Sequence, residues 1–474
     1  MDEREYDLIV IGAGPVGENV ADRAVQGGLT AVIVESELVG GECSYWACVP
    51  SKTLLRAGAA LQSARDVPGA REAISGDLDV AAVLRRRDEM TSHWRDDGQV
   101  AWLDSAGIDL VRGHGRLDGP RRVIVETMDA GTVTLTARHA VAVCTGSAAL
   151  MPGIPGLRDI EPWTSREATS VQEVPASLAI VGGGVVAVEM ATAFASLRTE
   201  VTMIVRHGLL GGFETFAGDA VGDALRAAGV RIREGSEVAS ARRSGTETTL
   251  ALTDGSEVTV AKVLVATGRV PRTADVGIET VGLTPGNWLD VDDTMQVTGI
   301  DGLYAVGDVN HRALLTHQGK YQARAAGDVI AARALSGPVD AGDWGTHAAT
   351  ADHAAVPQVV FTDPEVAAVG LTAAEAEDRG IRTRVLDVDL SSLAGASTRA
   401  SDYRGRARAI VDTDREVLVG ATLVGPDVAE LLQAATIAVV GEVPLVRLWH
   451  AVPAYPTLSE VWLRWLEAYG RPEA

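Results

Sequence analysis

Two cysteines and a lysine make the region around residue 45 the best candidate for redox chemistry in this chain. Cys43 and Cys48 are separated by four residues, and Lys52 follows four positions after Cys48. If the pair opens a helix, a disulfide can close across the first helical turns. A helix N-terminus and a nearby cation both lower the pKa of a thiol, so a thiolate is expected near neutral pH. The spacing therefore predicts a redox-active pair.

The composition supports a chemical role for this pair. Three cysteines in 474 residues do not make a disulfide scaffold, and two close together are typical of a reactive site in a reducing compartment, which predicts a cytoplasmic protein. Lysine is also scarce, because the chain has three lysines and 39 arginines. The presence of lysine rather than arginine at position 52 therefore suggests that a compact point charge is needed there. The alternative is two buried apolar cysteines beside a solvated lysine. Cys144 lies in an apolar run and is expected to be a core residue.

Two stretches show the strand, glycine-rich turn and helix that bind dinucleotides. The first has a buried strand over 6–11, a G-x-G-x-x-G turn, and an acid about twenty residues on, after strand 30–34. The glycines let the backbone approach a pyrophosphate, the helix N-terminus favours its charge, and the carboxylate accepts ribose hydroxyls. The residues expected to do this are Gly12, Gly14, Gly17 and Glu35.

The second stretch repeats this arrangement, with Gly182 and Gly184 in the turn between strands 178–181 and 201–205. Two such units suggest two bound dinucleotides, or one dinucleotide and a relic. From about residue 356 strands alternate with amphipathic helices and no nucleotide motif recurs, which predicts a separate C-terminal domain. Three further apolar strands end in short turns that contain glycine: Thr145-Gly146, Thr267-Gly268 and Gly307-Asp308.

Length and charge limit the possible partners. A chain of 474 residues is expected to form three or four domains. The formal charge of −22 argues against nucleic acid or an anionic membrane as a partner. Residues 176–197 are almost wholly apolar, but three consecutive glycines and Glu189 predict a buried strand, turn and helix rather than a membrane span. The acidic N-terminus shows no secretory signal.

Together these motifs resemble the flavoprotein disulfide reductases, the family of glutathione reductase, lipoamide dehydrogenase and mercuric reductase. The resemblance runs from Tyr6 to about Trp465 and includes G-G-x-C-x4-C-x-P-S-K, A-T-G-R, Y-A-V-G-D and the segment 357–365, which opens the dimer-interface domain in this family. It implies an α/β fold with two Rossmann-like dinucleotide-binding domains, for FAD and NAD(P)H, and a C-terminal α+β dimerisation domain. The expected ranges are 1–150 for the FAD-binding domain with the redox pair, 151–272 for the NAD(P)H-binding domain, 273–345 for the part that completes the FAD domain, and 346–474 for the dimerisation domain.

The resemblance also implies roles for single residues. Cys48 is expected to be the thiol next to the flavin, and Cys43 the thiol that exchanges with the substrate. Lys52 is expected near the flavin, paired with Glu189. Gly12, Gly14, Gly17 and Glu35 are expected to hold the ADP half of FAD. The other expected cofactor contacts are Gly115 on the adenine side, Thr145, Gly146, Asp308 at the ribityl chain and Thr316 near the flavin, with Gly182, Gly184, Val238 and Gly268 at the nicotinamide dinucleotide.

The residue after strand 201–205 bears on the choice of nucleotide. An acid there would accept the ribose 2′-hydroxyl of NADH, but the chain has Arg206. The planar fork of an arginine suits a 2′-phosphate, so NADPH is favoured and NADH is the alternative. Relatives selective for NADPH often carry a second arginine, but residues 209–212 contain none. The competing interpretation is that Arg206 is a solvated surface arginine with no role in binding.

Two departures from the family pattern bear on the acceptor. Between the cysteines the chain has Ser-Tyr-Trp-Ala, where many members have small or polar residues that include glycine. The C-terminal H-P-T-x-x-E motif begins with Tyr455 and ends with Glu460, so a tyrosine replaces the usual histidine. A phenol with pKa near 10 shuttles protons less readily than an imidazole, so slow reduction of disulfides is expected. Mercuric reductase also has tyrosine there, but it ends in a cysteine pair, and no cysteine follows Cys144 here.

The leading interpretation is a homodimeric FAD enzyme that uses NADPH or NADH to reduce a Cys43–Cys48 disulfide. Its electrons would pass to a small acceptor: a disulfide, a quinone or a thiophilic metal ion. Two alternatives remain open: a quinone or diaphorase-type reductase that uses the flavin directly, and a dihydrolipoamide dehydrogenase-like subunit of a larger complex. None of the nine histidines has ligand spacing, so no bound metal is expected.

Overall fold

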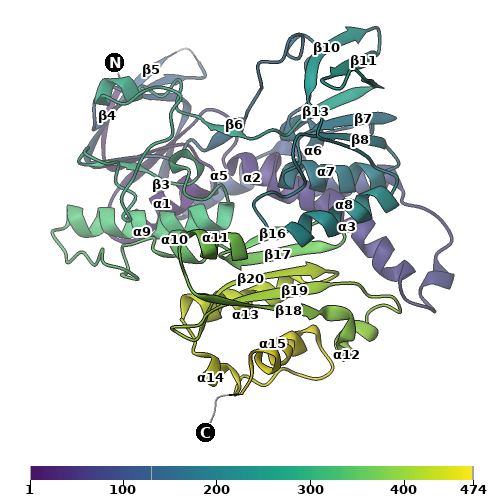
Figure 1. The fold of residues 1–474 in the computed structure, drawn as a ribbon. Coiled ribbons are helices and arrows are strands. Elements are labelled where there is room, and N and C mark those ends of the chain that lie inside the picture. The colour runs from purple at the N-terminus through teal and green to yellow at the C-terminus, as the bar shows by residue number, and fades with distance from the viewer. Residues whose placement is uncertain (1, 130, 472–474) are drawn as a thin grey trace. The chain divides into compact units, whose positions relative to one another are not determined.

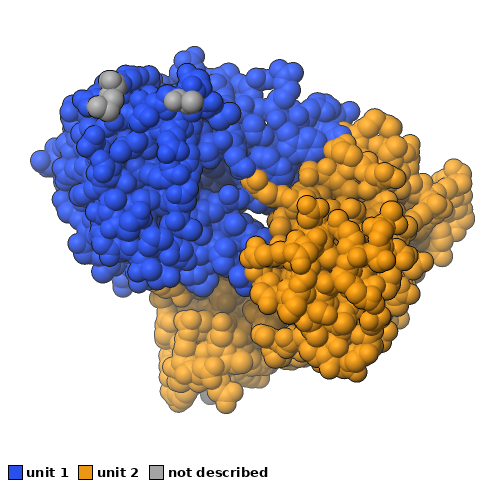
Figure 2. Space-filling view, turned by 90° about the horizontal axis from the view of Figure 1, so that it is seen from above, with its two compact units in different colours: residues 1–50, 88–150, 268–352 blue, residues 51–87, 151–267, 353–474 orange. Residues whose placement is uncertain are grey.

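The chain folds into two units, each assembled from three separate stretches of sequence (Figure 2), and its helices and strands are labelled in Figure 1. The computed structural model describes residues 2–129 and 131–471. Unit 1, blue in Figure 2, comprises residues 1–50, 88–150 and 268–352, and unit 2, orange, comprises 51–87, 151–267 and 353–474.

Unit 1 is built on a six-stranded sheet in the order β1-β2-β3-β4-β5-β15, in which β1 also pairs with β5. Neighbouring strands are parallel except at β4, which is antiparallel to both β3 and β5. The strands predicted at 6–11 and 30–34 are present, with ends shifted by at most four residues. The apolar strands expected before Thr145-Gly146 and Gly307-Asp308 are also present, but the first of them, β5, begins already at Thr132. The strands are β1 (Asp2–Ile11), β2 (Ala31–Glu35), β3 (Ile108–Leu117), β4 (Arg122–Thr127), β5 (Thr132–Val143) and β15 (Leu303–Ala305).

The helices of unit 1 cover this sheet with small side chains. The helix α1 (Pro15–Gln26) begins directly after the first glycine turn, with proline at its first position, and packs against α9 (Thr316–Ala334). Alanines of both helices share one apolar cluster with β1 and β2. Unit 1 also contains α2 (Gly41–Tyr45), α5 (Asp97–Ser105) and a two-stranded ladder of β6 (Ser147–Ala149) and β14 (Arg269–Pro271).

Unit 2 contains the second strand, glycine turn and helix. Its parallel sheet has the order β13-β7-β8-β9, next to an antiparallel sheet β10-β11-β12. The strands are β7 (Ser177–Val181), β8 (Glu200–Val205), β9 (Arg231–Glu234), β10 (Val238–Ser244), β11 (Glu247–Leu252), β12 (Glu257–Val260) and β13 (Lys262–Val265). The helices are α3 (Cys48–Arg65), which begins in unit 1, α4 (Val80–Met90), which ends there, α6 (Ser165–Thr169), α7 (Val185–Ser196) and α8 (Thr215–Ala227).

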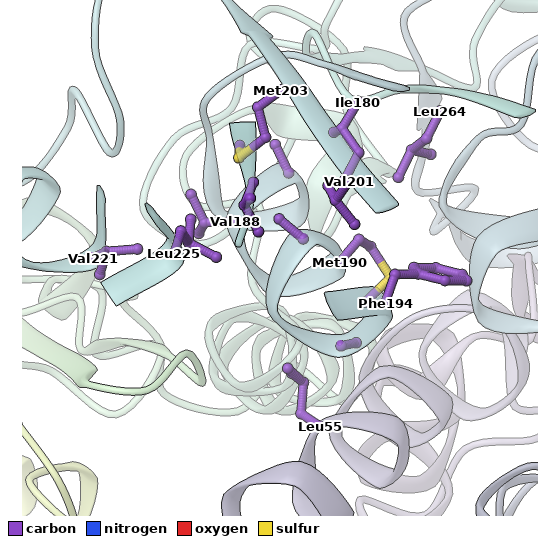
Figure 3. Packing of buried hydrophobic residues seen from close by; sticks show 14 of the residues in the cluster. Leu55, Ile180, Val188, Met190, Phe194, Val201, Met203, Val221, Leu225 and Leu264 are labelled. Carbon is purple, nitrogen blue, oxygen red and sulfur yellow. The ribbon is translucent and has the colours of Figure 1, made fainter. Parts of the chain in front are cut away.

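The apolar run at 176–197 is a buried strand, turn and helix, as predicted. It forms β7 and α7, and α7 is buried on most of its surface because strands pack on one side of it and α3 on another. Among the described residues, no helix combines the length and apolar character needed to cross a membrane. Figure 3 shows part of this core, with Val188, Met190 and Phe194 of α7 among Ile180, Val201, Met203 and Leu264 of the strands and Leu55 of α3.

The C-terminal part of unit 2 is a separate five-stranded antiparallel sheet in the order β16-β17-β20-β19-β18 with its own apolar core. Its strands are β16 (Gln358–Val360), β17 (Glu365–Gly370), β18 (Thr383–Asp389), β19 (Arg406–Asp412) and β20 (Val417–Gly425). The helices nearby in sequence are α10 (Ala351–Ala354), α11 (Ala373–Asp378), α12 (Ala394–Ser397), α13 (Leu432–Val440), α14 (Leu445–Leu448) and α15 (Val461–Tyr469).

Candidate functional site

The two cysteines lie at the junction of two helices. Cys43 is inside the short helix α2, which ends where the Trp46 N–H donates to the carbonyl oxygen of Glu42 at 2.8 Å. Cys48 is the first residue of α3. Both are half-buried and are thiols in this structure. The expectation that the pair opens one helix is therefore wrong for Cys43, because the backbone leaves the helical conformation at Trp46.

The two thiols are close enough to influence each other. Hydrogen bonding with Cys48, followed by burial, raises the pKa of the Cys43 thiol, while Thr316 opposes this shift. The lowered pKa expected from a helix N-terminus is therefore not found at Cys43. Sγ of Cys48 lies 3.3 Å from Oγ1 of Thr316, the first residue of α9.

The lysine of α3 is held by a buried carboxylate. Nζ of Lys52 donates to Oε2 of Glu189 at 2.7 Å, and the Glu189 side chain is only 4% exposed. The second oxygen of this carboxylate accepts the backbone N–H of Phe361 at 3.0 Å, and the Phe361 ring centroid lies 5.1 Å from Nζ of Lys52. The structure thus contains the lysine–glutamate pair that the resemblance implied, and it fixes the ammonium group one helical turn after Cys48 on α3.

The turn between β1 and α1 fits a dinucleotide. Gly12 has φ +105°, and a Cβ there would lie 2.5 Å from the carbonyl oxygen of Cys144, so only glycine is accepted. Gly17 packs against the carbonyl of Gly12, whereas Gly14 has no heavy atom within 4 Å of a Cβ position, so the turn is open there. Oε2 of Glu35, at the end of β2, accepts the N–H of Ala13 in the turn at 2.7 Å, and burial raises the pKa of Glu35.

Two buried oxygens in the same region support this fit. Oγ1 of Thr145 and Oε1 of Glu18 are buried and make no hydrogen bond. Thr145 follows β5 and lies directly against Gly12, and Glu18 is in the first turn of α1. Leaving buried polar atoms unpaired is costly, and a polar ligand in the turn would pair them.

The carboxylate of Asp308 is part of a small polar network in unit 1. Its Oδ2 accepts a hydrogen bond from the hydroxyl of Ser147 at 2.5 Å. Oγ of Ser147 in turn accepts a hydrogen bond from Nε of Arg269, also at 2.5 Å. Sequence reasoning gave no role to Ser147 or Arg269. The sequence offered only their proximity to motifs as a clue: Ser147 directly follows Thr145-Gly146, and Arg269 is the last residue of A-T-G-R.

The remaining glycines expected at the cofactor lie at strands or their ends. Gly115 is in the middle of β3, opposite Val125 of β4, and a Cβ there would lie 3.0 Å from the side chain of Val34. Gly146, three residues after the end of β5, has φ +70°, and the carbonyl oxygen of Gly268 accepts a hydrogen bond from the N–H of Leu150 at 2.9 Å.

The second glycine turn has the same local geometry as the first. Gly182 has φ +129°, and a Cβ there would overlap the carbonyl of Ala266, while Gly184 is open at its Cβ position. Arg206 follows β8 directly with a side chain 64% exposed, and its Nε lies 3.9 Å from Oε1 of Glu237. Val238 is buried at the start of β10. These residues fit a second dinucleotide whose ribose end is near a cation.

The two C-terminal residues expected to act in catalysis differ in environment. Tyr455 is 78% exposed, whereas Glu460 is buried. Oε1 of Glu460 is paired with Arg464, one helical turn on, and its Oε2 is buried without a hydrogen bond. Within residues 2–129 and 131–471 no group of three or more His, Cys, Asp or Glu side chains is placed to hold a metal ion.

Comparison with known proteins agrees with this geometry. Residues 6–327 match the family model "Pyridine nucleotide-disulphide oxidoreductase", and residues 356–465 match the dimerisation domain of the same family. The chain is 32% identical over 469 residues to mercuric reductase of Acidithiobacillus ferrooxidans, covering 97% of this chain and 82% of that protein. It is 31% identical over 464 residues to dihydrolipoyl dehydrogenase 2 of Haloarcula marismortui, covering 96% and 94%.

A solved structure shares the fold across almost the whole chain. The Cu(II) complex of the HOCl-induced flavoprotein disulfide reductase RclA from Escherichia coli superposes with a TM-score of 0.83 at 23% identity, covering 98% of this chain and 99% of that one. The fold class expected from the sequence is confirmed. With two family models covering most of the chain, this protein belongs to the pyridine nucleotide-disulphide oxidoreductase family, whose members use FAD and NAD(P)H.

Proposed function

We propose that this chain is a homodimeric FAD enzyme that takes electrons from NADPH and passes them through Cys43 and Cys48 to a small acceptor. The observation that carries the proposal is the pair of adjacent thiols at the junction of α2 and α3, with Sγ of Cys48 3.3 Å from Oγ1 of Thr316. When bound, FAD supplies two-electron exchange between the nicotinamide and the thiols. The chain's own residues hold the cofactors, position the thiols and hold the protons at sulfur.

The proposed roles follow the environments of the residues. Cys48 is the thiol next to the flavin, and Cys43 is the thiol that exchanges with the acceptor; the contact of Cys48 with Thr316, the first residue of α9, supports this order. Lys52 and Glu189 place one fixed charge pair on α3 and α7. The proposed FAD contacts are Gly12, Gly14, Gly17, Glu35, Gly115, Thr145, Gly146, Asp308 and Thr316, and the proposed nucleotide contacts are Gly182, Gly184, Arg206, Val238 and Gly268. The proposed domain ranges are 1–150, 151–272, 273–345 and 346–474, in a cytoplasmic enzyme.

Arg206 supports NADPH as the electron donor. Its contact with Glu237 is long, and both side chains are more than half exposed, so the guanidinium group is able to turn toward a 2′-phosphate. Arg206→Ala should raise the KM for NADPH about tenfold and leave the KM for NADH within about twofold, since one charge-assisted contact is lost. A wild-type kcat/KM that is higher for NADH than for NADPH would reject this choice.

The phenol of Tyr455 favours the interpretation that the acceptor can be reduced without protonation of a sulfur atom. A disulfide substrate requires a proton for the thiolate that leaves, and a phenol provides it less readily than an imidazole. Quinones, dyes and thiophilic metal ions do not require this proton. Tyr455→His should therefore raise the rate of disulfide reduction more than the rate of quinone reduction.

The proposal is tested by assaying the purified enzyme with NADPH and a panel of acceptors: a quinone, a dye, Hg²⁺, glutathione disulfide and lipoamide. Cys43→Ser should reduce turnover at least about 100-fold with every acceptor that receives electrons from the thiols. The matched control is Cys144→Ala, since Cys144 is a buried core residue. Full activity of Cys43→Ser with all acceptors would show that the flavin reduces them directly. Wild-type turnover of disulfides on the order of hundreds per second would contradict the role given to Tyr455.

A further inference from the structure

The main chain between the two cysteines is held by a stretch about fifty residues away in sequence. Tyr45, in the middle of the C-x4-C segment, is 1% exposed, and its single hydroxyl donor lies between two carbonyl oxygens, that of Val39 at 3.1 Å and that of Arg95 at 3.4 Å. The carbonyl oxygen of Tyr45 in turn accepts the indole N–H of Trp94 at 3.1 Å. One residue of the segment is thus fixed by both its side chain and its backbone.

The Tyr45 hydroxyl is a permanent donor. Burial, with the carboxylate of Asp96 as the next cause, raises the pKa of Tyr45 to about 12. The phenol therefore keeps its proton at neutral and mildly alkaline pH, so its hydrogen bonds do not depend on its own titration there.

Trp94 reaches Tyr45 because it lies in an unusual left-handed turn. Ser92, His93 and Trp94 have φ of +50°, +52° and +53°. Residues other than glycine avoid this region, and it is uncommon for three in a row to adopt it. Such a backbone persists only where its surroundings impose it, and it is found mostly at functional sites. Here the turn is closed by the N–H of Trp94, which donates to the carbonyl of Thr91 at 2.9 Å.

A further contact holds the residues just before the cysteine segment. Oδ2 of Asp96 accepts the N–H of Val39 at 2.8 Å and Nη2 of Arg112 at 2.6 Å. Residues 94–96 therefore contact the chain on the N-terminal side of Cys43 and also between the two cysteines, all within unit 1.

We propose that Tyr45 and Trp94 form a clamp that holds the chain between Cys43 and Cys48 in the geometry of a disulfide and thereby sets the redox potential of the pair. A disulfide accepts a narrow range of Cα separations and dihedral angles. Two thiols that are already held in this range lose less entropy when the bond closes. The clamp consequently favours the disulfide over the dithiol and makes the potential more negative. Both are positioning residues, and the inference rests on the proposed function.

The test is the thiol–disulfide equilibrium of the FAD-loaded enzyme with dithiothreitol. As the Cys43–Cys48 bond forms, the two thiols lose two protons and two electrons, and the cyclic disulfide of dithiothreitol takes them up as its S–S bond opens into two thiols. The oxidised fraction is measured by alkylation of the free thiols and mass spectrometry. Flavin content and the unfolding temperature are recorded for each variant.

Two variants each remove one donor and keep an aromatic ring: Trp94→Phe and Tyr45→Phe. Because a single donor is lost, each should lower the equilibrium constant for the disulfide about three- to tenfold, which is about 15 to 30 mV toward positive potential. The matched control is Trp102→Phe, an exposed tryptophan on α5, which should leave the constant within about twofold.

The outcomes separate the clamp from the proposed function. If oxidised wild-type enzyme contains no Cys43–Cys48 disulfide, the proposed function is wrong. If wild type has the disulfide but Trp94→Phe and Tyr45→Phe titrate as wild type does, the clamp is refuted. The clamp is also refuted if Trp102→Phe shifts the potential equally, or if both variants fail to retain flavin, since the residues would then be needed for folding rather than for the potential.

Discussion

At the scale of single residues, the sulfur of Cys48 offers a direct spectroscopic test. If a Cys48 thiolate lies against oxidised FAD, partial reduction of the enzyme should produce a long-wavelength absorption band, because charge is transferred from the sulfur to the flavin. The band should be absent from Cys48→Ser and unchanged in Cys144→Ala, since burial raises the pKa of the Cys144 thiol and keeps it neutral. Stepwise reduction monitored by absorbance checks this. A wild-type band in Cys48→Ser would remove Cys48 from the site next to the flavin.

A second residue-scale prediction concerns Glu18, whose pKa depends on folding. Burial, opposed in part by Lys320, raises the pKa of Glu18 from 4.5 to about 7. A carboxyl group with a raised folded-state pKa contributes stability that is fully present below the unfolded value and is lost as pH rises through the folded value. Ionised Glu18 should therefore destabilise the protein above about pH 7 by on the order of 1–3 kcal/mol.

Glu18→Gln removes this titration and keeps the shape of the side chain. The unfolding temperature of the flavin-free protein, in which no ligand pairs Oε1 of Glu18, should rise by a few degrees at pH 8 and by much less at pH 5. Equal shifts at the two pH values would show that packing rather than ionisation is responsible. A lower unfolding temperature at pH 8 would contradict the prediction.

At the scale of elements, a buried ion pair joins the start of α8 to the C-terminal sheet. Glu214, just before α8, is buried, and its two oxygens accept Nη1 of Arg408 and the N–H of Ala373, both at 2.8 Å. Arg408→Met leaves this carboxylate buried without its cation. The free energy of unfolding should fall by about 2–4 kcal/mol, because breaking one side of a buried pair is expensive.

Arg406 provides the matched control. Both arginines lie over the Phe216 ring, Arg406 at 4.5 Å and Arg408 at 5.3 Å from its centroid, and both pair with Asp387. Among the described residues, Arg406 makes no hydrogen bond with Glu214, and its side chain is 45% exposed. Arg406→Met should cost less than about 1 kcal/mol. Urea unfolding of both variants measures the difference, and equal losses would show that the shared contacts with Phe216 and Asp387, rather than the buried carboxylate of Glu214, are responsible.

At the scale of the whole molecule, the family's dimerisation domain predicts a homodimer with an apolar interface. Residues 356–465 match that domain, and Ile437 on α13 is 58% exposed. An obligate interface usually buries more than about 2,000 Å² and excludes unpaired charge. Ile437→Asp should therefore convert the dimer to monomer in light scattering at micromolar concentration. Met128→Asp, at a position 79% exposed outside this domain, should remain a dimer. A monomeric, fully active wild type would refute the expectation.

Features that are encoded over short distances could be predicted from the sequence. The glycine turns at Gly12 and Gly182 follow from spacing, because a turn between a strand and a helix is set by a few consecutive residues and their allowed φ values. The same is true of the apolar run at 176–197, whose glycines and Glu189 distinguish a core strand and helix from a membrane span. The order of these local motifs was enough to indicate the fold class and the family.

Several contacts between residues that are far apart in the sequence could not be predicted and are seen only in the folded structure. Ser147 and Asp308 are 161 positions apart, Glu189 and Phe361 are 172 apart, and Tyr45 and Trp94 are 49 apart. No helix or strand period connects such partners, since their contact depends on strand order and on how helices pack. The junction at Trp46 and the left-handed turn at Ser92–Trp94 also lie outside any local preference, because ordinary residues adopt these conformations only when surrounding contacts impose them.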